Sequence, residues 1–172
     1  MQRNGLKKTG DDKVFIENIN FNSQWLKKGW SRMNDKKILV TYFTASEGRV
    51  TERVAKNLAA AVSGDIFEIA AKDRYTKADI NWVNPLSRCN KEKLGKKDVE
   101  IAGKLQNIQD YDLILIGFPV WYGGAPNIIN TFLKGYDFSG KKIALFATSG
   151  GGGMGRSKEK LQSLLPNAAV ID

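Results

Sequence analysis

The chain has 172 residues, 42% of them hydrophobic and 26% charged, which fits a single globular domain of roughly 100–200 residues. It contains no histidine and one cysteine, Cys89, which excludes a serine–histidine or cysteine–histidine catalytic site, a histidine-ligated metal centre, a disulfide within the chain and a cysteine cluster. The formal net charge of +9 comes without a nucleic-acid-binding module, an apolar membrane span or a signal core, so we expect a cytoplasmic protein that binds no nucleic acid.

Much of the positive charge lies at the start of the chain. Residues 1–37 hold nine lysines and arginines against four acids. Residues 1–35 show no sustained helical or strand period, and we predict that they form a basic leader outside the core fold. The regular pattern starts at residue 36 and continues to the last residue, which predicts one domain over 36–172.

Strand-like runs and helical periods alternate along this domain. Residues 38–43 form a continuous apolar run, typical of a strand buried on both faces of a parallel sheet. A helix follows, with Thr51 as its predicted N-cap and Gly64 just past its end. The next predicted elements, in chain order, are a strand at 65–69, a polar segment at 72–97, a helix at 98–107, a strand at 111–118, a helix at 127–134, a strand at 141–148, a helix at 155–165 and a strand at 168–171.

This alternation predicts right-handed crossovers between parallel strands. The expected architecture is an α/β three-layer sandwich around a five-stranded parallel sheet. Because such a sheet usually ends with a helix that covers the last strand, we expect that final helix to be absent or replaced by the leader.

Three loops follow the carboxyl ends of the first, third and fourth predicted strands, where parallel sheets bind their ligands. The loop at 44–51 is rich in hydroxyl groups and leads into a helix N-terminus, which favours phosphate binding. The loop at 118–126 places two large aromatic residues beside two glycines, as a site for a planar ring would. The loop at 148–155 is rich in glycine and offers backbone N–H groups.

Each loop also has a plainer interpretation: a capped turn, core packing of one aromatic ring, and a linker. Taken together, a phosphate cradle, a stacking loop and a backbone-lined loop at one sheet edge describe a site for flavin mononucleotide (FMN). Residues 36–172 resemble the flavodoxin family through the hydroxyl-rich loop 44–51, the segment Gly-Phe-Pro-Val-Trp-Tyr at 117–122, the helix start at 125–132 and Ala-Thr-Ser-Gly-Gly at 147–151. The long segment after the second strand is similar to that of a bacterial branch of the family.

The resemblance implies a flavodoxin-like strand order, 2-1-3-4-5, and FMN as the cofactor. It implies that the site residues are Thr44, Ala45, Ser46, Gly48, Arg49, Val50 and Thr51 at the phosphate, Pro119, Val120, Trp121, Tyr122 and Gly123 beside the ring, and Thr148, Ser149, Gly150, Gly151 and Gly152 at its pyrimidine edge. The loop at 44–51 is longer than the usual family motif and contains Glu47, which we expect to face solvent, with Arg49 offsetting its charge.

Three functions stay open from the sequence. The first is an electron-transfer protein that works with redox partner proteins, a reductase and an acceptor, which we favour over a self-sufficient FMN-dependent oxidoreductase. The second is a flavin or quinone reductase that uses NAD(P)H, for which Arg88 or a nearby lysine in the basic segment 72–97 would meet an anionic substrate. The third is an interaction module without a cofactor.

Overall fold

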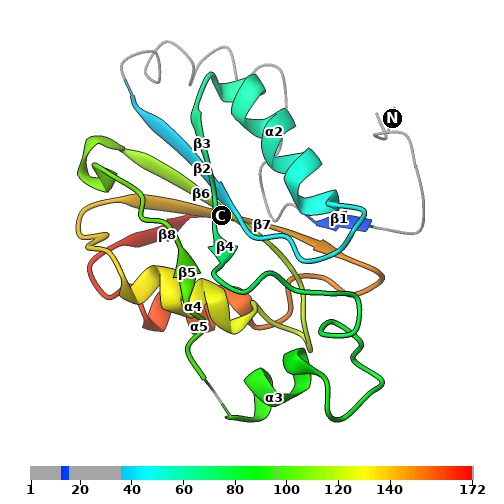
Figure 1. Cartoon of the computed structure of the whole chain (residues 1–172). Coiled ribbons are helices and arrows are strands. Elements are labelled where there is room, and N and C mark those ends of the chain that lie inside the picture. The colour runs from blue at the N-terminus through cyan, green and yellow to red at the C-terminus, as the bar shows by residue number, and fades with distance from the viewer. Residues whose placement is uncertain (1–12, 16–35, 96, 172) are drawn as a thin grey trace.

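The structure, a computed structural model, describes residues 13–15, 36–95 and 97–171 of the chain (Figure 1). Its strands are β1 (Lys13–Phe15), β2 (Ile38–Tyr42), β3 (Asp65–Glu68), β4 (Ala70–Ala71), β5 (Ile101–Ala102), β6 (Leu113–Pro119), β7 (Lys142–Ser149) and β8 (Ala169–Ile171). The helices are α2 (Val50–Val62), α3 (Arg88–Gly95), α4 (Asn127–Lys134) and α5 (Ser157–Ser163), with a short 3-10 helix η1 (Ile108–Asp110).

The main sheet contains five parallel strands in the order β3-β2-β6-β7-β8. This order confirms the predicted fold class and strand order. A sixth strand, β1, pairs antiparallel with the far end of β7, where Lys13 lies opposite Ser149. Three residues of the predicted leader therefore join the sheet, and the other leader residues lie outside the described part of the chain.

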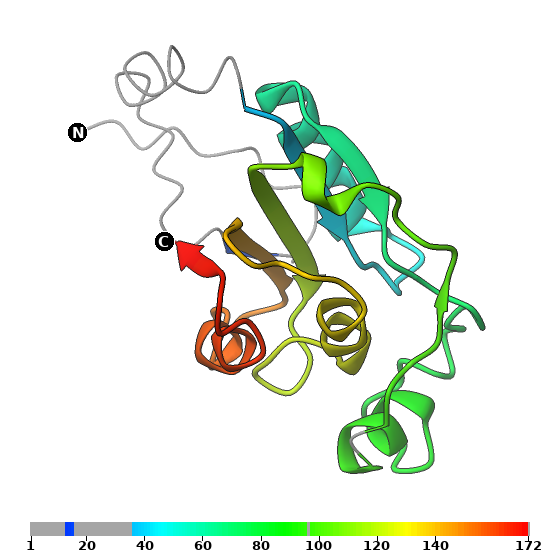
Figure 2. The same cartoon turned by 90° about the vertical axis from the view of Figure 1, so that its left-hand side faces the viewer.

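Helices cover both faces of the main sheet. Alternate residues of β2 face opposite ways: Val40 packs with Leu58 of α2, whereas Leu39 belongs to the cluster that contains Phe132 of α4 and Leu161 of α5. Figure 2 shows α4 and α5 side by side, with α2 on the other side of the strands. The result is the three-layer sandwich that the continuous apolar strands predicted.

A long insertion, residues 69–107, separates β3 from η1 and β6. It contains a small antiparallel ribbon, β4 with β5, and carries α3 well away from the main sheet (Figure 1). The helix predicted at 98–107 is wrong. Val99 is buried, Glu100 is exposed and Ile101 is partly buried, which is the two-residue period of a strand, and Gly103 then turns the chain at a φ of 76°.

Two classes of feature are absent from the described residues. No helix there is long and apolar enough to cross a bilayer. No group of three or more histidine, cysteine or carboxylate side chains there could hold a metal ion. Cys89 is a buried free thiol.

Candidate functional site

The loop between β2 and α2 presents backbone donors. Its turn is closed by the N–H of Arg49, which donates to the carbonyl oxygen of Ser46 at 3.0 Å. The N–H groups of residues 44–48 donate no hydrogen bond to any other described residue. Because the first N–H groups of α2 also lack helical partners, the loop and the helix start offer a set of donors beside the positive end of the helix dipole.

Arg49 is the N-cap of α2, with a φ of 44° and no side-chain cap. Thr51 was predicted as the N-cap, and that prediction is wrong because the preceding turn makes α2 begin at Val50. Thr51 is instead buried, and its hydroxyl oxygen lies 2.8 Å from that of Thr148 at the end of β7. This bond joins two of the three loops predicted to form the site.

Charges around the first loop are arranged differently from the expectation. Glu47 does face solvent, with 80% of its side chain exposed, but its partner is Lys77 at 3.8 Å. Arg49 does not offset Glu47, because its guanidinium binds Glu52 and, at 3.2 Å, Glu68. Hydrogen bonding from Arg49 lowers the pKa of Glu52 to about 2.

Aromatic rings from three segments meet beyond the carboxyl ends of the strands. Trp121 packs edge-on against Tyr75 and Phe43, with ring centres 5.5 and 5.7 Å apart. Tyr75 and Phe43 also contact each other at 5.5 Å. Each such pair adds about 0.5–1.5 kcal/mol beyond the burial of its area, so the cluster fixes the loop after β6 against the insertion.

The loop after β6 is a tight two-residue turn. The N–H and carbonyl groups of Trp121 and Gly124 bond to each other at 2.9 and 3.0 Å. The two residues between them, Tyr122 and Gly123, have φ angles of 54° and 73°. A positive φ is uncommon for tyrosine, and here it turns the Tyr122 ring toward α3.

Tyr122 is held by contacts with α3. Its hydroxyl donates to the side-chain oxygen of Asn90 and lies 3.3 Å from the sulfur of Cys89. Burial and the hydrogen bond with Cys89 raise the pKa of Tyr122 to about 12. The phenol is therefore neutral at pH 7.

A cavity of about 310 Å³ lies between the loop after β6 and the insertion. Its lining is mostly apolar and consists of Ile80, Trp82, Cys89, Val120, Trp121 and Tyr122. No carboxylate or amine belongs to this set. The cavity therefore suits a flat, largely apolar group.

The loop after β7 packs tightly against the turn at Gly123. The N–H of Arg156 donates to the carbonyl oxygen of Gly123 at 3.2 Å. Gly155 has a φ of 59°, and a Cβ atom there would lie 2.3 Å from the same oxygen. By contrast, a Cβ atom on Gly150 or Gly151 would meet nothing within 4 Å, so part of the loop is open to a ligand.

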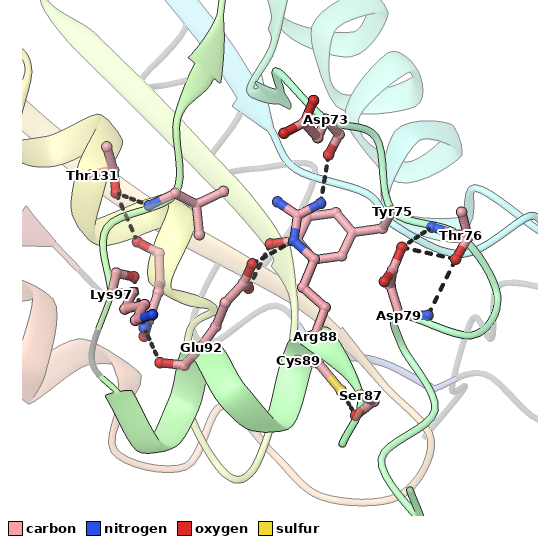
Figure 3. A network of polar contacts seen from close by, with 12 residues as sticks. Asp73, Tyr75, Thr76, Asp79, Ser87, Arg88, Cys89, Glu92, Lys97 and Thr131 are labelled. Atoms are coloured by element: carbon pink, nitrogen blue, oxygen red, sulfur yellow. Dashed lines mark hydrogen bonds and ion pairs between the residues drawn. The ribbon is translucent and has the colours of Figure 1, made fainter. Parts of the chain in front are cut away.

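A polar network anchors the insertion to the aromatic cluster (Figure 3). Tyr75 donates to one carboxylate oxygen of Glu92 at 2.7 Å, and Nε of Arg88 donates to the other at 2.6 Å. The guanidinium of Arg88 lies over the Tyr75 ring, 4.0 Å from its centre, and donates to the backbone oxygen of Asp73. Because these bonds occupy Arg88, its side chain serves the fold of the insertion.

Sequence reasoning did not assign Ile80, Trp82 or Cys89 to the site. These cavity residues come from the insertion, whose contacts with the loop after β6 span more than thirty positions of sequence, as in the bond between Cys89 and Tyr122. The sequence signal for helix α3, which carries Cys89, was the four-residue spacing of Arg88 and Glu92, which suits an ion pair on a helix.

Comparison with known proteins agrees with the family that the sequence resembles. A family model described as flavodoxin matches residues 37–172. The chain belongs to the flavodoxin family. Among curated proteins, none matches the chain significantly.

Solved structures resemble this flavodoxin-family chain over most of its length. A candidate flavoprotein from Bacteroides eggerthii is 43% identical, with a TM-score of 0.74 over 78% of this chain and 84% of its own. A second, from Bacteroides uniformis, is 40% identical, with a TM-score of 0.73 over 77% and 85%. A flavoprotein from Lactobacillus acidophilus, solved in complex with FMN, shares the fold at 24% identity, with a TM-score of 0.64 over 79% and 90%.

The flavodoxin fold brings the predicted site residues to one end of the sheet. The loop between β2 and α2 and the loop after β7 are joined through Thr51 and Thr148. The loops after β6 and β7 are joined by the N–H of Val120, which donates to the carbonyl oxygen of Thr148 at 2.8 Å. The structure therefore places the three loops in mutual contact, and their individual roles toward a cofactor stay predictions.

Proposed function

We propose that this flavodoxin-family protein binds FMN without a covalent bond and acts as an electron-transfer protein. The proposal is carried by a donor-rich loop at a helix start together with an aromatic cavity of about 310 Å³, whose wall residue Trp121 packs against Phe43 directly before that loop. These are the two requirements of a phosphorylated, planar cofactor.

The residues present fit the group. The N–H groups of residues 44–48 are available to phosphate oxygens, and the one acid among these residues, Glu47, points into solvent and pairs with Lys77. Arg49 lies beside the loop, but its guanidinium is paired with two carboxylates, those of Glu52 and Glu68, so the backbone N–H groups are the main donors for a phosphate. The open faces of Gly150 and Gly151 leave room for the polar edge of the ring.

When bound, FMN supplies the one- and two-electron chemistry, so the chain needs no catalytic acid or nucleophile. The chain's own residues bind and shield. Trp121 and Trp82 both line the cavity, where their rings would shield part of a bound flavin from solvent. Because the pKa of Tyr122 is raised to about 12, this phenol holds its proton at pH 7 and adds no negative charge beside the ring.

The first test compares FMN with riboflavin, which lacks the phosphate. The purified chain is titrated with each flavin, and binding is followed by quenching of flavin fluorescence. We expect FMN to bind more tightly than riboflavin. We expect Ser46→Asp to weaken FMN binding by about fivefold or more, because two like charges about 4 Å apart repel by about 1 kcal/mol in water and by more near a protein surface.

Ser139→Asp is the matched control, since Ser139 is exposed in the turn before β7 and away from the three loops. It should bind FMN like the unchanged chain. Equal affinity for the two flavins would contradict the phosphate cradle. The absence of binding to either would refute the proposal and favour an interaction module without a cofactor.

A second candidate function is a flavin-dependent reductase that takes electrons from NAD(P)H and passes them to a quinone. The apolar cavity wall, with Trp82 largely exposed at its rim, favours this alternative. Sustained consumption of NADPH or NADH with a quinone and no other protein would establish it. Turnover only when a separate reductase is added would support the electron-transfer role.

A further inference from the structure

The insertion ends in an exposed apolar surface, here called the tip, formed by Trp82, Val83, Leu86 and Leu94. These side chains are 73%, 68%, 72% and 81% exposed. Exposed large apolar residues are unremarkable when scattered, but a group of them marks an interaction site. Both views show α3 standing off the main body (Figure 1, Figure 2), so nothing in the described chain covers the tip.

Polar bonds fix the tip in this exposed form. The amide of Asn90 on α3 donates to the carbonyl oxygens of Trp82 and Asn84 at 3.0 and 2.8 Å. The N–H of Leu86 donates to the side-chain oxygen of Asn84 at 3.0 Å. Leu94 lies four residues after Asn90 and therefore on the same face of α3. These hydrogen bonds fix the backbone of residues 82–86 in the conformation that leaves the apolar side chains exposed.

Lysines surround the tip without acidic partners. Lys91, Lys93 and Lys97 are exposed and form no ion pair with a described residue. The nearest acid on α3, Glu92, turns inward to Arg88 and Tyr75. Lys93 lies over the Tyr122 ring, 3.8 Å from its centre, which places positive charge at the edge of the cavity.

The tip adjoins the candidate FMN site through Trp82. This residue belongs both to the tip and to the cavity lining that includes Trp121. A protein seated on the tip would therefore lie next to the cavity mouth. That position suits electron transfer, which needs close approach between two redox groups.

We propose that the tip is the docking surface for an electron-transfer protein with an acidic, partly apolar surface. The apolar side chains would supply the buried centre of the interface, and the lysines would supply steering and a polar rim. The redox nature of the partner rests on the proposed function; the acidic docking surface does not. A second copy of the chain is a poor occupant, because each copy carries a formal net charge of +9.

The test titrates the isotope-labelled chain, without added FMN, with two haem proteins of opposite charge at low ionic strength. The soluble domain of cytochrome b5 is the acidic probe, and cytochrome c is the basic probe. We expect the acidic probe to bind and to shift the backbone amide signals of residues 80–97. Raising the salt concentration should weaken the binding, because exposed charges are screened.

Two sets of variants separate charge from apolar contact. Lys91→Glu with Lys93→Glu should weaken binding of the acidic probe by about tenfold, since the double change replaces two attractive charge contacts at the rim with repulsive ones. Leu94→Ser should also weaken it, without loss of folding, because this side chain is 81% exposed. Lys104→Glu with Lys142→Glu is the control of equal charge, as both residues are exposed away from the tip.

Several results would overturn the inference. Tighter binding of the basic probe, no binding of either probe, or amide shifts confined to residues outside 80–97 would each do so. If the chain forms a dimer that the tip variants abolish, the tip belongs to a second copy. If the tip variants weaken binding of the chain to anionic and to zwitterionic lipid vesicles equally, the tip belongs to a lipid surface. Failure to bind FMN alongside tip-specific binding of the acidic probe would refute the proposed function and leave the docking surface standing.

Discussion

Replacing Gly155 with alanine should separate two loops of the candidate site. A Cβ atom at this position would lie 2.3 Å from the carbonyl oxygen of Gly123 and 2.9 Å from its carbonyl carbon. Both are backbone atoms, so no side-chain rotation relieves the contact. The φ of 59° at Gly155 is also unfavourable for any residue with a Cβ atom.

The expected cost combines these two effects. A left-handed backbone costs alanine about 1–2 kcal/mol, and forcing an extra carbon into packed surroundings costs about 1–3 kcal/mol. Relaxation of the loop after β7 limits their sum, and the bond from the N–H of Arg156 to Gly123, at 3.2 Å, is the first to lengthen. We expect Gly155→Ala to lower the free energy of unfolding by about 2–4 kcal/mol.

Urea denaturation measures this loss, and fluorescence titration measures FMN affinity. Gly153→Ala is the matched control, because a Cβ atom there meets nothing within 4 Å and its φ is not positive. We expect FMN binding to weaken by at least about tenfold in Gly155→Ala, because the displaced loop belongs to the candidate site. This corresponds to a loss of about 1.4 kcal/mol of binding free energy. If the two variants have equal stability and equal affinity, the close contact between the loops does not shape the site.

Three further predictions concern stability and pH. Hydrogen bonding from Arg49 lowers the pKa of Glu52 to about 2, so the ion pairs of Glu52 stabilise the protein above pH 4.5 and are lost as the pH falls toward 2. We expect Glu52→Gln to lower the free energy of unfolding by about 1 kcal/mol at pH 7. In urea titrations this difference should shrink as the pH falls from 4.5 to 2. Thr51→Val should cost about 1–2 kcal/mol by leaving the buried hydroxyl of Thr148 without its partner, and a double valine variant that is no more stable than the single one would contradict this account. Tyr75→Phe keeps the ring but removes the 2.7 Å hydrogen bond from the hydroxyl to the carboxylate of Glu92. Hydrogen exchange of the backbone amides at 80–95 should therefore become faster. Unchanged exchange would show that this bond does not anchor the insertion.

The sequence predicted the main sheet well because its central strands, β2, β6 and β7, are buried on both faces. β6 has five consecutive buried residues, Ile114 to Phe118, and such a run is a strong signal for a central parallel strand. The positions of the three loops of the candidate site were also predictable, since these loops follow such strands directly and consist of hydroxyl-bearing, aromatic or glycine residues. Local composition was sufficient for these features.

Contacts that cross long stretches of sequence were not predictable. The packing of Tyr75 on Trp121 and the bond from Tyr122 to α3 depend on how the insertion folds back over the site. The partner of Arg49 was wrong for a related reason, because Glu68 becomes its neighbour only when β3 pairs with β2. The error at 98–107 arose because β5 has only two residues, and an alternation confined to residues 99–101 is too short to indicate a strand from the sequence alone.

The pairing of β1 also protects the sheet from unwanted association. On the side of β7 that faces away from β6, β8 pairs only with Lys142–Ala144. β1 pairs with Ala147–Ser149 at the other end of the same side. Unpaired strand edges are templates for addition of a strand from another molecule. A short piece of a basic N-terminal segment thus shields the part of β7 nearest the candidate site, and it does so with backbone hydrogen bonds that depend little on its side chains.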